Sequence, residues 1–100
     1  MNNIKNFDGL IGKSISEFYR TKNTIEFIFS DKSSIKFCNN ETTNEIVGSL
    51  YDILYLPIIS YDFNQSKDVF SHTIKTRDGV VLIKWTIKDF EDFYITMLYK

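Results

Sequence analysis

Residues 69–88, VFSHTIKTRDGVVLIKWTIK, form two runs of alternating apolar and polar residues on either side of Asp78-Gly79. An Asp-Gly pair between two such runs is among the strongest short-range signals of a β-hairpin, because both central residues of a type I′ turn need positive φ. With this pair in the turn, the alternation predicts four cross-strand pairs: Thr76 with Val81, Ile74 with Ile83, His72 with Trp85, and Phe70 with Ile87. A one-residue slip would turn the shared apolar face outward, so the segment predicts a β-rich domain with a defined register.

Five further segments alternate apolar and polar residues with a period of two, which is typical of half-buried strands. They span residues 15–20, 24–30, 34–38, 58–63 and 93–99. Lys22-Asn23 predicts a tight turn between the first two segments. The hairpin of the second and third segments is expected to pair two sets of residues: Phe27 with Phe37, and Phe29 with Ile35.

One segment carries the signals of a short helix. Ser49 can cap its start, with Asp52 three residues on as in a capping box, and Pro57 ends it because the residue before proline avoids the α region. Its apolar stripe consists of three residues at helical spacing: Leu50, Ile53 and Leu54. Residues 44–47 fit either an extension of this helix or a short strand, and an extension would place Gly48 inside the helix at a cost of about 1 kcal/mol.

These elements together predict an α+β fold that is dominated by β-structure. We expect a single compact domain over residues 1–100, in which one short helix packs on a curved, mostly antiparallel sheet of about six to seven strands. With 100 residues, 43% of them hydrophobic, the chain is long enough to bury a core without disulfides or metal.

Charge and composition narrow the classes of function. The chain carries 12 Lys and Arg against 13 Asp and Glu, whereas nucleic-acid binding rests on clustered basic residues. A small basic strip on the outer face of the last hairpin, formed by Lys75, Lys84 and Lys88, does not change that expectation. No apolar run approaches the roughly 20 residues of a membrane span, the start of the chain has no signal-peptide pattern, and Cys38 is the single cysteine. We expect a cytoplasmic protein without disulfides, membrane attachment or bound nucleic acid.

Three motifs follow one another along the chain. They are Leu10-Ile11-Gly12-Lys13-Ser14-Ile15, then Gly48-Ser49-Leu50-Tyr51-Asp52-Ile53 running into Leu56-Pro57-Ile58, and finally Gly79-Val80-Val81-Leu82-Ile83-Lys84-Trp85. In order and spacing they resemble the pattern of a family of small uncharacterised domains found mostly in bacteriophage and prophage genomes. The resemblance implies a phage or mobile-element protein that acts in the cytoplasm of a bacterial host. The family's Asp-Cys-Cys stretch and its Gly- and Tyr-rich tail have no counterpart here, so no site residue is carried over.

The sequence offers little catalytic chemistry. One cysteine and one histidine cannot make a structural zinc site, and the four glycines form no phosphate-binding loop. Cys38 and His72 could form a nucleophile–base pair, but no third group is apparent that would orient the histidine. Asp89, Glu91 and Asp92 fall together on an expected turn, where a solvated acidic loop is the usual structure. We therefore expect no enzyme, and no catalytic residue, cofactor or metal.

Aromatic residues are more numerous than one small core needs. The chain has nine Phe, six Tyr and one Trp, and tyrosine is enriched at binding interfaces. Tyrosines at the edge of the core with hydrated hydroxyls are the structural alternative. The candidate binding residues are Tyr51, Tyr55, His72, Trp85, Tyr94 and Tyr99.

The leading hypothesis is a non-catalytic phage- or mobile-element-type protein that binds a host protein, for example as a stoichiometric inhibitor of a bacterial defence system. It depends on the small size, the surplus of aromatic residues and the resemblance. One alternative is a small-molecule binder that holds a nucleotide-like ligand between Trp85, His72 and neighbouring rings. Another is a homo-oligomeric structural protein in which the strand over residues 93–99 pairs with its copy.

Overall fold

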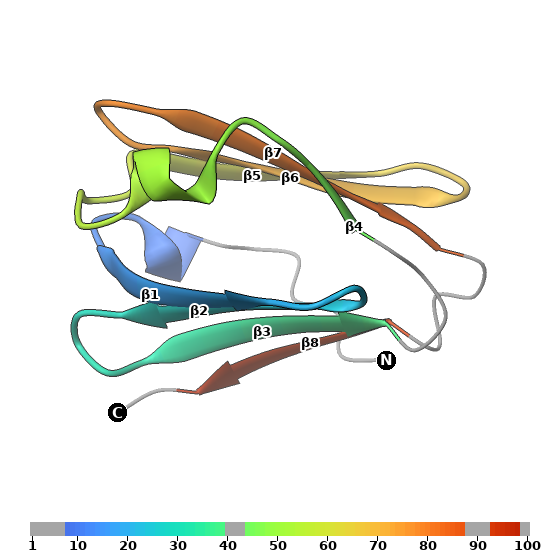
Figure 1. Cartoon of the computed structure of the whole chain (residues 1–100), viewed down its shortest axis with the longest axis horizontal. Coiled ribbons are helices and arrows are strands. Elements are labelled where there is room, and N and C mark those ends of the chain that lie inside the picture. The colour runs from blue at the N-terminus through green and yellow to red at the C-terminus, as the bar shows by residue number, and fades with distance from the viewer. Residues whose placement is uncertain (1–7, 40–43, 88–92, 99–100) are drawn as a thin grey trace.

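The computed structural model describes residues 8–39, 44–87 and 93–98. In this part of the chain, eight strands form two four-stranded antiparallel sheets that face each other (Figure 1). The first sheet has the order β1-β2-β3-β8, with β1 over Ile15–Arg20, β2 over Thr24–Phe29, β3 over Ser34–Asn39 and β8 over Phe93–Leu98. The second has the order β4-β7-β6-β5, with β4 over Asn44–Val47, β7 over Val80–Thr86, β6 over Val69–Lys75 and β5 over Ser60–Gln65. Two short 3₁₀ helices accompany them, η1 over Asp8–Leu10 and η2 over Leu50–Ile53.

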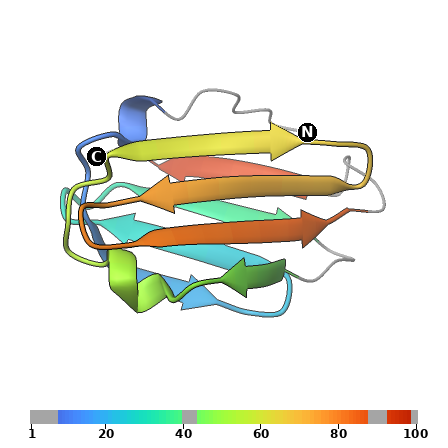
Figure 2. The same ribbon diagram turned by 90° about the horizontal axis from the view of Figure 1, so that it is seen from above.

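The two sheets enclose an apolar core. Seen from above, the second sheet lies over the first, and the strands of both run along the long axis of the molecule (Figure 2). Along β2 and β7 buried positions alternate with more exposed ones, as strands with one face on a core require. The largest fully buried side chains come from both sheets: Trp85, Phe27, Phe29 and Phe37.

The hairpin of β6 and β7 has a register two residues away from the predicted one. The structure pairs Phe70 with Trp85, His72 with Ile83, and Ile74 with Val81. The predicted pairs are therefore wrong, although the apolar face is right, because a shift of two residues returns every side chain to the same face. The N–H of Thr76 donates to the carbonyl of Gly79 at 2.9 Å, so Arg77-Asp78 forms the turn.

Gly79 serves close packing instead of a left-handed turn conformation. The described residues with positive φ are Gly12, Lys32, Gly48 and Tyr55, and Gly79 is not among them. A Cβ on Gly79 would lie 2.7 Å from the carbonyl oxygen of Asp52 and 2.8 Å from its Cβ. The glycine thus lets η2 rest directly on the start of β7.

The hairpin of β2 and β3 also departs from its predicted pairs by two residues. Ile25 pairs with Phe37, and Phe27 pairs with Ile35. The connection is a three-residue loop in which Lys32, with φ of 77°, takes the left-handed position that such loops need. The predicted tight turn at Lys22-Asn23 is confirmed, since Thr21 N–H donates to the carbonyl of Thr24 across it.

The β-dominated, antiparallel character is confirmed, but the α part of the predicted α+β class is wrong. The expected helix is the four-residue 3₁₀ helix η2, capped by Ser49 as predicted, and the described residues contain no α-helix. It stops because Leu54 forms a parallel bridge with Ile15 of β1, and the Tyr55 N–H donates to the Ile15 carbonyl at 2.8 Å. The backbone of Leu54 and Tyr55 therefore pairs with the edge of the first sheet instead of continuing the helix.

The predicted count of six to seven strands is close. Residues 44–47, open between helix and strand, form β4. The strand expected over 58–63 is β5 and begins two residues later, at Ser60. The strand expected over 93–99 is β8, which pairs with β3 and lies at one edge of its sheet.

Replacing Gly79 with alanine should lower the free energy of unfolding by about 1–3 kcal/mol, the usual cost of forcing an extra carbon into a packed contact. The reason is the approach of the new Cβ to the Asp52 backbone. Gly9→Ala is the matched control, because nothing lies within 4 Å of the Cβ position there. Urea unfolding compares the two variants, and equal midpoints would contradict this explanation of Gly79.

Candidate binding surface

Two of the predicted binding residues, His72 and Trp85, form a hydrogen-bonded group with Tyr61 inside the core. The Trp85 indole N–H donates to His72 Nε2 at 3.1 Å, and His72 Nδ1 lies 2.7 Å from the Tyr61 hydroxyl. Since Nε2 accepts, the neutral ring carries its proton on Nδ1 and donates it to the Tyr61 oxygen. Burial lowers the pKa of His72 to about 3. The ring is a neutral connector between two other side chains.

This arrangement removes His72 and Trp85 from the binding surface. Both are fully buried, and the His72 ring packs 4.4 Å from that of Phe37. The structure therefore corrects their predicted role as surface contacts. A Cys38–His72 catalytic pair does not form either, because Cys38 lies half-exposed on β3 next to Thr24 while both ring nitrogens of His72 are engaged in the core.

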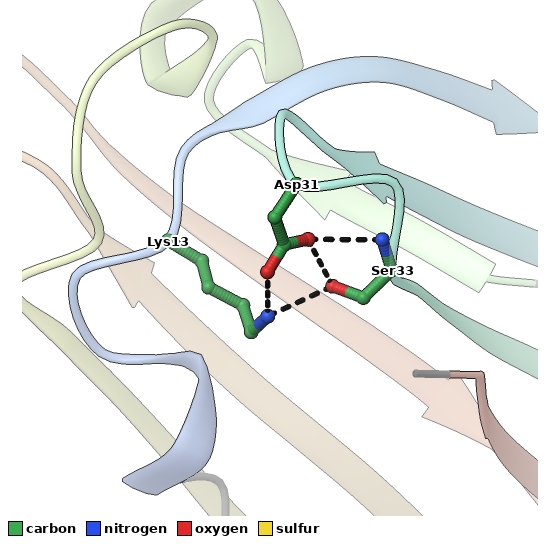
Figure 3. A network of polar contacts seen from close by, with 3 residues as sticks. All are labelled: Lys13, Asp31 and Ser33. Atoms are coloured by element: carbon green, nitrogen blue, oxygen red, sulfur yellow. Dashed lines mark hydrogen bonds and ion pairs between the residues drawn. The ribbon is translucent and has the colours of Figure 1, made fainter. Parts of the chain in front are cut away.

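A second polar group joins the turn after β2 to the segment before β1 (Figure 3). The Lys13 ammonium pairs with the Asp31 carboxylate and donates to Ser33 Oγ at 2.8 Å, and the Ser33 N–H donates to Asp31 at 2.9 Å. A serine beside a lysine can be a nucleophile and its base. Here the lysine nitrogen is bonded to both the Asp31 carboxylate and Ser33 Oγ, and hydrogen bonds from Lys13 and Ser33 lower the pKa of Asp31. The group thus fastens a turn and lacks a free base.

Three exposed tyrosines lie together on the side of the molecule where β1 and η2 meet. Tyr51 and Tyr55 are 75% and 72% exposed, and Tyr19 is 55% exposed. The Tyr51 ring stands edge-on to Phe18 with 5.2 Å between centroids. We call Phe18, Tyr19, Tyr51 and Tyr55 the tyrosine surface. The Tyr94 side chain and Tyr99 fall outside the described part of the structure.

Two shallow grooves adjoin on this surface and share Phe18 and Tyr51. The first, of about 260 Å³, is lined by Phe18, Arg20, Ile46, Gly48, Ser49, Leu50 and Tyr51. The second, of about 290 Å³, is lined by Ser16, Glu17, Phe18, Tyr19, Tyr51, Leu54 and Tyr55. We call the second the Glu17 groove, after its one charged lining residue.

The backbone around η2 turns the tyrosines outward. Leu50 and Ile53 are buried, so the residues between them face solvent. Tyr55 has φ of 70°, a left-handed conformation that bulky residues rarely adopt. Strain of this kind persists where the surroundings impose it, and it gathers at functional sites. Here the hydrogen bond from Tyr55 N–H to Ile15 imposes it and holds the ring beside β1.

Polar groups of β1 also face this surface. The Thr21 N–H bonds across to β2, so by the alternation of an antiparallel pair the N–H and C=O of Phe18 point away from β2. Arg20 bends toward β4 and donates to Asn44 from Nε at 2.6 Å and from Nη2 at 3.2 Å. The Tyr19 hydroxyl donates to Glu17 at 3.2 Å, and this bond, with the negative charges of Glu17 and Glu26, raises the pKa of Tyr19.

The sequence identified only part of this surface. The surplus of tyrosines predicts Tyr51 and Tyr55, whereas Glu17 and Phe18 are not among the predicted binding residues. The alternation along residues 15–20 places Glu17 and Tyr19 on the same face, and that was the available signal. The sequence pattern does not predict that η2 lies beside this strand.

Comparison of the chain with protein-family models, with curated proteins and with solved structures finds no match. The resemblance to phage domains therefore stays a prediction. Within the described ranges, no group of three or more His, Cys, Asp or Glu is placed to hold a metal ion, and no helix has the length and apolar character needed to cross a bilayer. Asp89, Glu91 and Asp92 lie outside these ranges.

The stability of the folded chain should fall with acid below pH 6.5. His72 has a pKa of about 3 when folded against 6.5 when unfolded, so between these values the unfolded chain binds the extra proton. The stability that comes from burying a neutral His72 is present above pH 6.5 and is lost as the pH falls toward 3. Lowering the pH from 7 to 5 should therefore reduce the free energy of unfolding by about 2 kcal/mol. Urea unfolding at both pH values measures it.

The ring itself provides the control, because His72 is the single histidine of the chain. Its Cε1 proton resonance in the folded protein should not titrate between pH 8 and pH 5. A titration centred near pH 6.5 in the folded state would show that the ring is not the buried connector described above.

Proposed function

We propose that this chain is a non-catalytic binding protein that contacts a partner protein through the tyrosine surface. The observation that carries the proposal is the gathering of Tyr19, Tyr51 and Tyr55, each more than half exposed, around two adjoining grooves. Tyrosine supplies large contact area with few rotatable bonds and dominates many interface hot spots. An exposed aromatic patch beside a sheet edge is costly to leave uncovered, and this favours a partner.

The shape of the grooves favours a protein over a small ligand. Their volumes, about 260 and 290 Å³, lie near the lower end of the roughly 300–1,000 Å³ of typical ligand pockets. The nucleotide-like ligand considered between Trp85 and His72 gains no support, since both side chains are buried and line neither groove. A shallow aromatic surface suits a partner that covers it from outside.

The proposed partner is a host protein, and the proposed role is stoichiometric inhibition of a bacterial defence system in the cytoplasm. This part rests on the resemblance of the chain to phage and prophage domains. Inhibition by occlusion needs only a stable interface, which agrees with a site built from contact residues.

Removing the two most exposed rings should abolish partner binding and leave the fold intact. In the variant Tyr51→Ser/Tyr55→Gly, we expect at least about a tenfold loss of a partner captured from bacterial lysate, because truncating interface hot spots commonly costs 2 kcal/mol or more. Glycine also relieves the positive φ at position 55, so the free energy of unfolding should change by less than about 1 kcal/mol.

Ile59→Ser is the matched control, because Ile59 is a similarly exposed apolar residue that lines neither groove. It should retain the partner at the wild-type level. A partner that binds both variants equally, or a wild-type chain that neither retains a partner nor affects any host defence, would refute the proposal.

A second candidate function is self-association through β8. The observation that favours it is the position of this strand at the end of the first sheet, with β3 as its neighbour. An edge strand can pair with a copy of itself. Sedimentation equilibrium over a wide concentration range should then show a dimer whose fraction rises with concentration, and a monomer throughout would exclude this function.

A further inference from the structure

We infer that the Glu17 groove accepts a guanidinium group, so that the partner presents an arginine side chain there. The inference deepens the proposed function and rests on it. Its basis is the combination of one exposed carboxylate with the rings of Tyr19, Tyr51 and Tyr55 around a single shallow groove.

No ion pair among the described residues neutralises the charge of the groove. The ion pairs within the described residues join Lys13 to Asp31 and Arg77 to Asp78, and Glu17 takes part in neither. The nearest cation along β1, Arg20, turns away to Asn44. Glu17 is thus left with one hydrogen bond, from the Tyr19 hydroxyl, and a carboxylate has room for several more.

A neighbouring carboxylate strengthens the negative character of this edge. Glu26 of β2 lies directly opposite Tyr19 of β1, and Tyr19 is on the same face of β1 as Glu17. The bond to Glu17 is the main cause of the raised pKa of Tyr19, and the negative charges of Glu17 and, least, Glu26 add to it. Lys36 lies opposite Glu26 on β3, one strand further from the groove.

The chemistry of the lining selects the cation. The faces of aromatic rings, tyrosine included, attract cations. A guanidinium group can stack flat on a ring while its N–H groups bond a carboxylate in pairs, whereas an ammonium group offers only a point charge. The backbone C=O of Phe18, which points away from β2, offers a further acceptor at the same place. These groups together suit arginine better than lysine.

The test is an NMR titration of the ¹⁵N-labelled chain with three blocked pentapeptides of the form Thr-Val-X-Val-Thr. In these X is arginine, lysine or citrulline, the neutral isostere of arginine. We expect the arginine peptide to shift the amides of Glu17, Tyr19 and Tyr55 and to bind about tenfold more tightly than the citrulline peptide, with lysine between them. Equal binding of the arginine and citrulline peptides, or shifts confined to another face, would overturn the inference.

A substitution isolates the carboxylate. In Glu17→Gln, the preference for arginine over citrulline should fall from about tenfold to about threefold or less, the part that the tyrosine rings supply. The control Glu45→Gln changes an exposed carboxylate of β4 that lines neither groove and should keep the full preference. Binding of the natural partner to the two variants distinguishes a failure of this inference from a failure of the proposed function. If Glu17→Gln retains that partner fully while Tyr51→Ser/Tyr55→Gly loses it, the tyrosine surface binds a protein and the arginine contact is wrong. If both lose it, both proposals stand.

Discussion

The segment from Gly48 to Ile59 joins the two sheets along one side, and both the fold and the tyrosine surface depend on it. It meets the second sheet where Asp52 packs on Gly79 and where the Ile59 N–H donates to the Lys75 carbonyl at 2.8 Å. It meets the first sheet through the bond of Tyr55 to Ile15. A chain fastened at both ends has little freedom in between, so the side chains of η2 are presented in fixed directions at low entropic cost.

The same segment explains why a strained tyrosine is tolerated. The left-handed φ of Tyr55 would be easily met by glycine, and the exposed ring adds little to the core. The conformation is imposed because the backbone must return to β1 directly after η2. A large aromatic residue at such a position costs stability without evident benefit to folding, which is the pattern expected of a residue kept for contact.

The sequence predicted the faces of the strands well and their partners less well, for one physical reason. Period-two alternation determines which side chains point inward, but a shift of two residues preserves that pattern, so Phe70 could pair with Ile87 or with Trp85 at no cost in burial. The close approach of Gly79 to η2 is one tertiary contact that favours the observed register, and no local sequence signal reports such a contact. The predicted helix was wrong for the same reason. The cap at Ser49 can be read from neighbouring residues, whereas the bridge of Leu54 to β1, which ends the helix, is a tertiary contact.

The candidate site was also predicted only in part, because the sequence does not show which tertiary contacts its residues make. Tyr51 and Tyr55 could be predicted because a small core cannot hold every tyrosine, whereas His72 and Trp85 lie on an apolar face where a buried polar group and a ligand contact look alike in sequence. What separates them is hydrogen-bond satisfaction. The Trp85 donor and both nitrogens of His72 find partners inside the core, while Glu17 keeps free acceptor positions at the surface. The group of Trp85, His72 and Tyr61 is thus satisfied inside the core, whereas the open acceptors of Glu17 lie beside exposed rings at the edge of β1, where a partner reaches both.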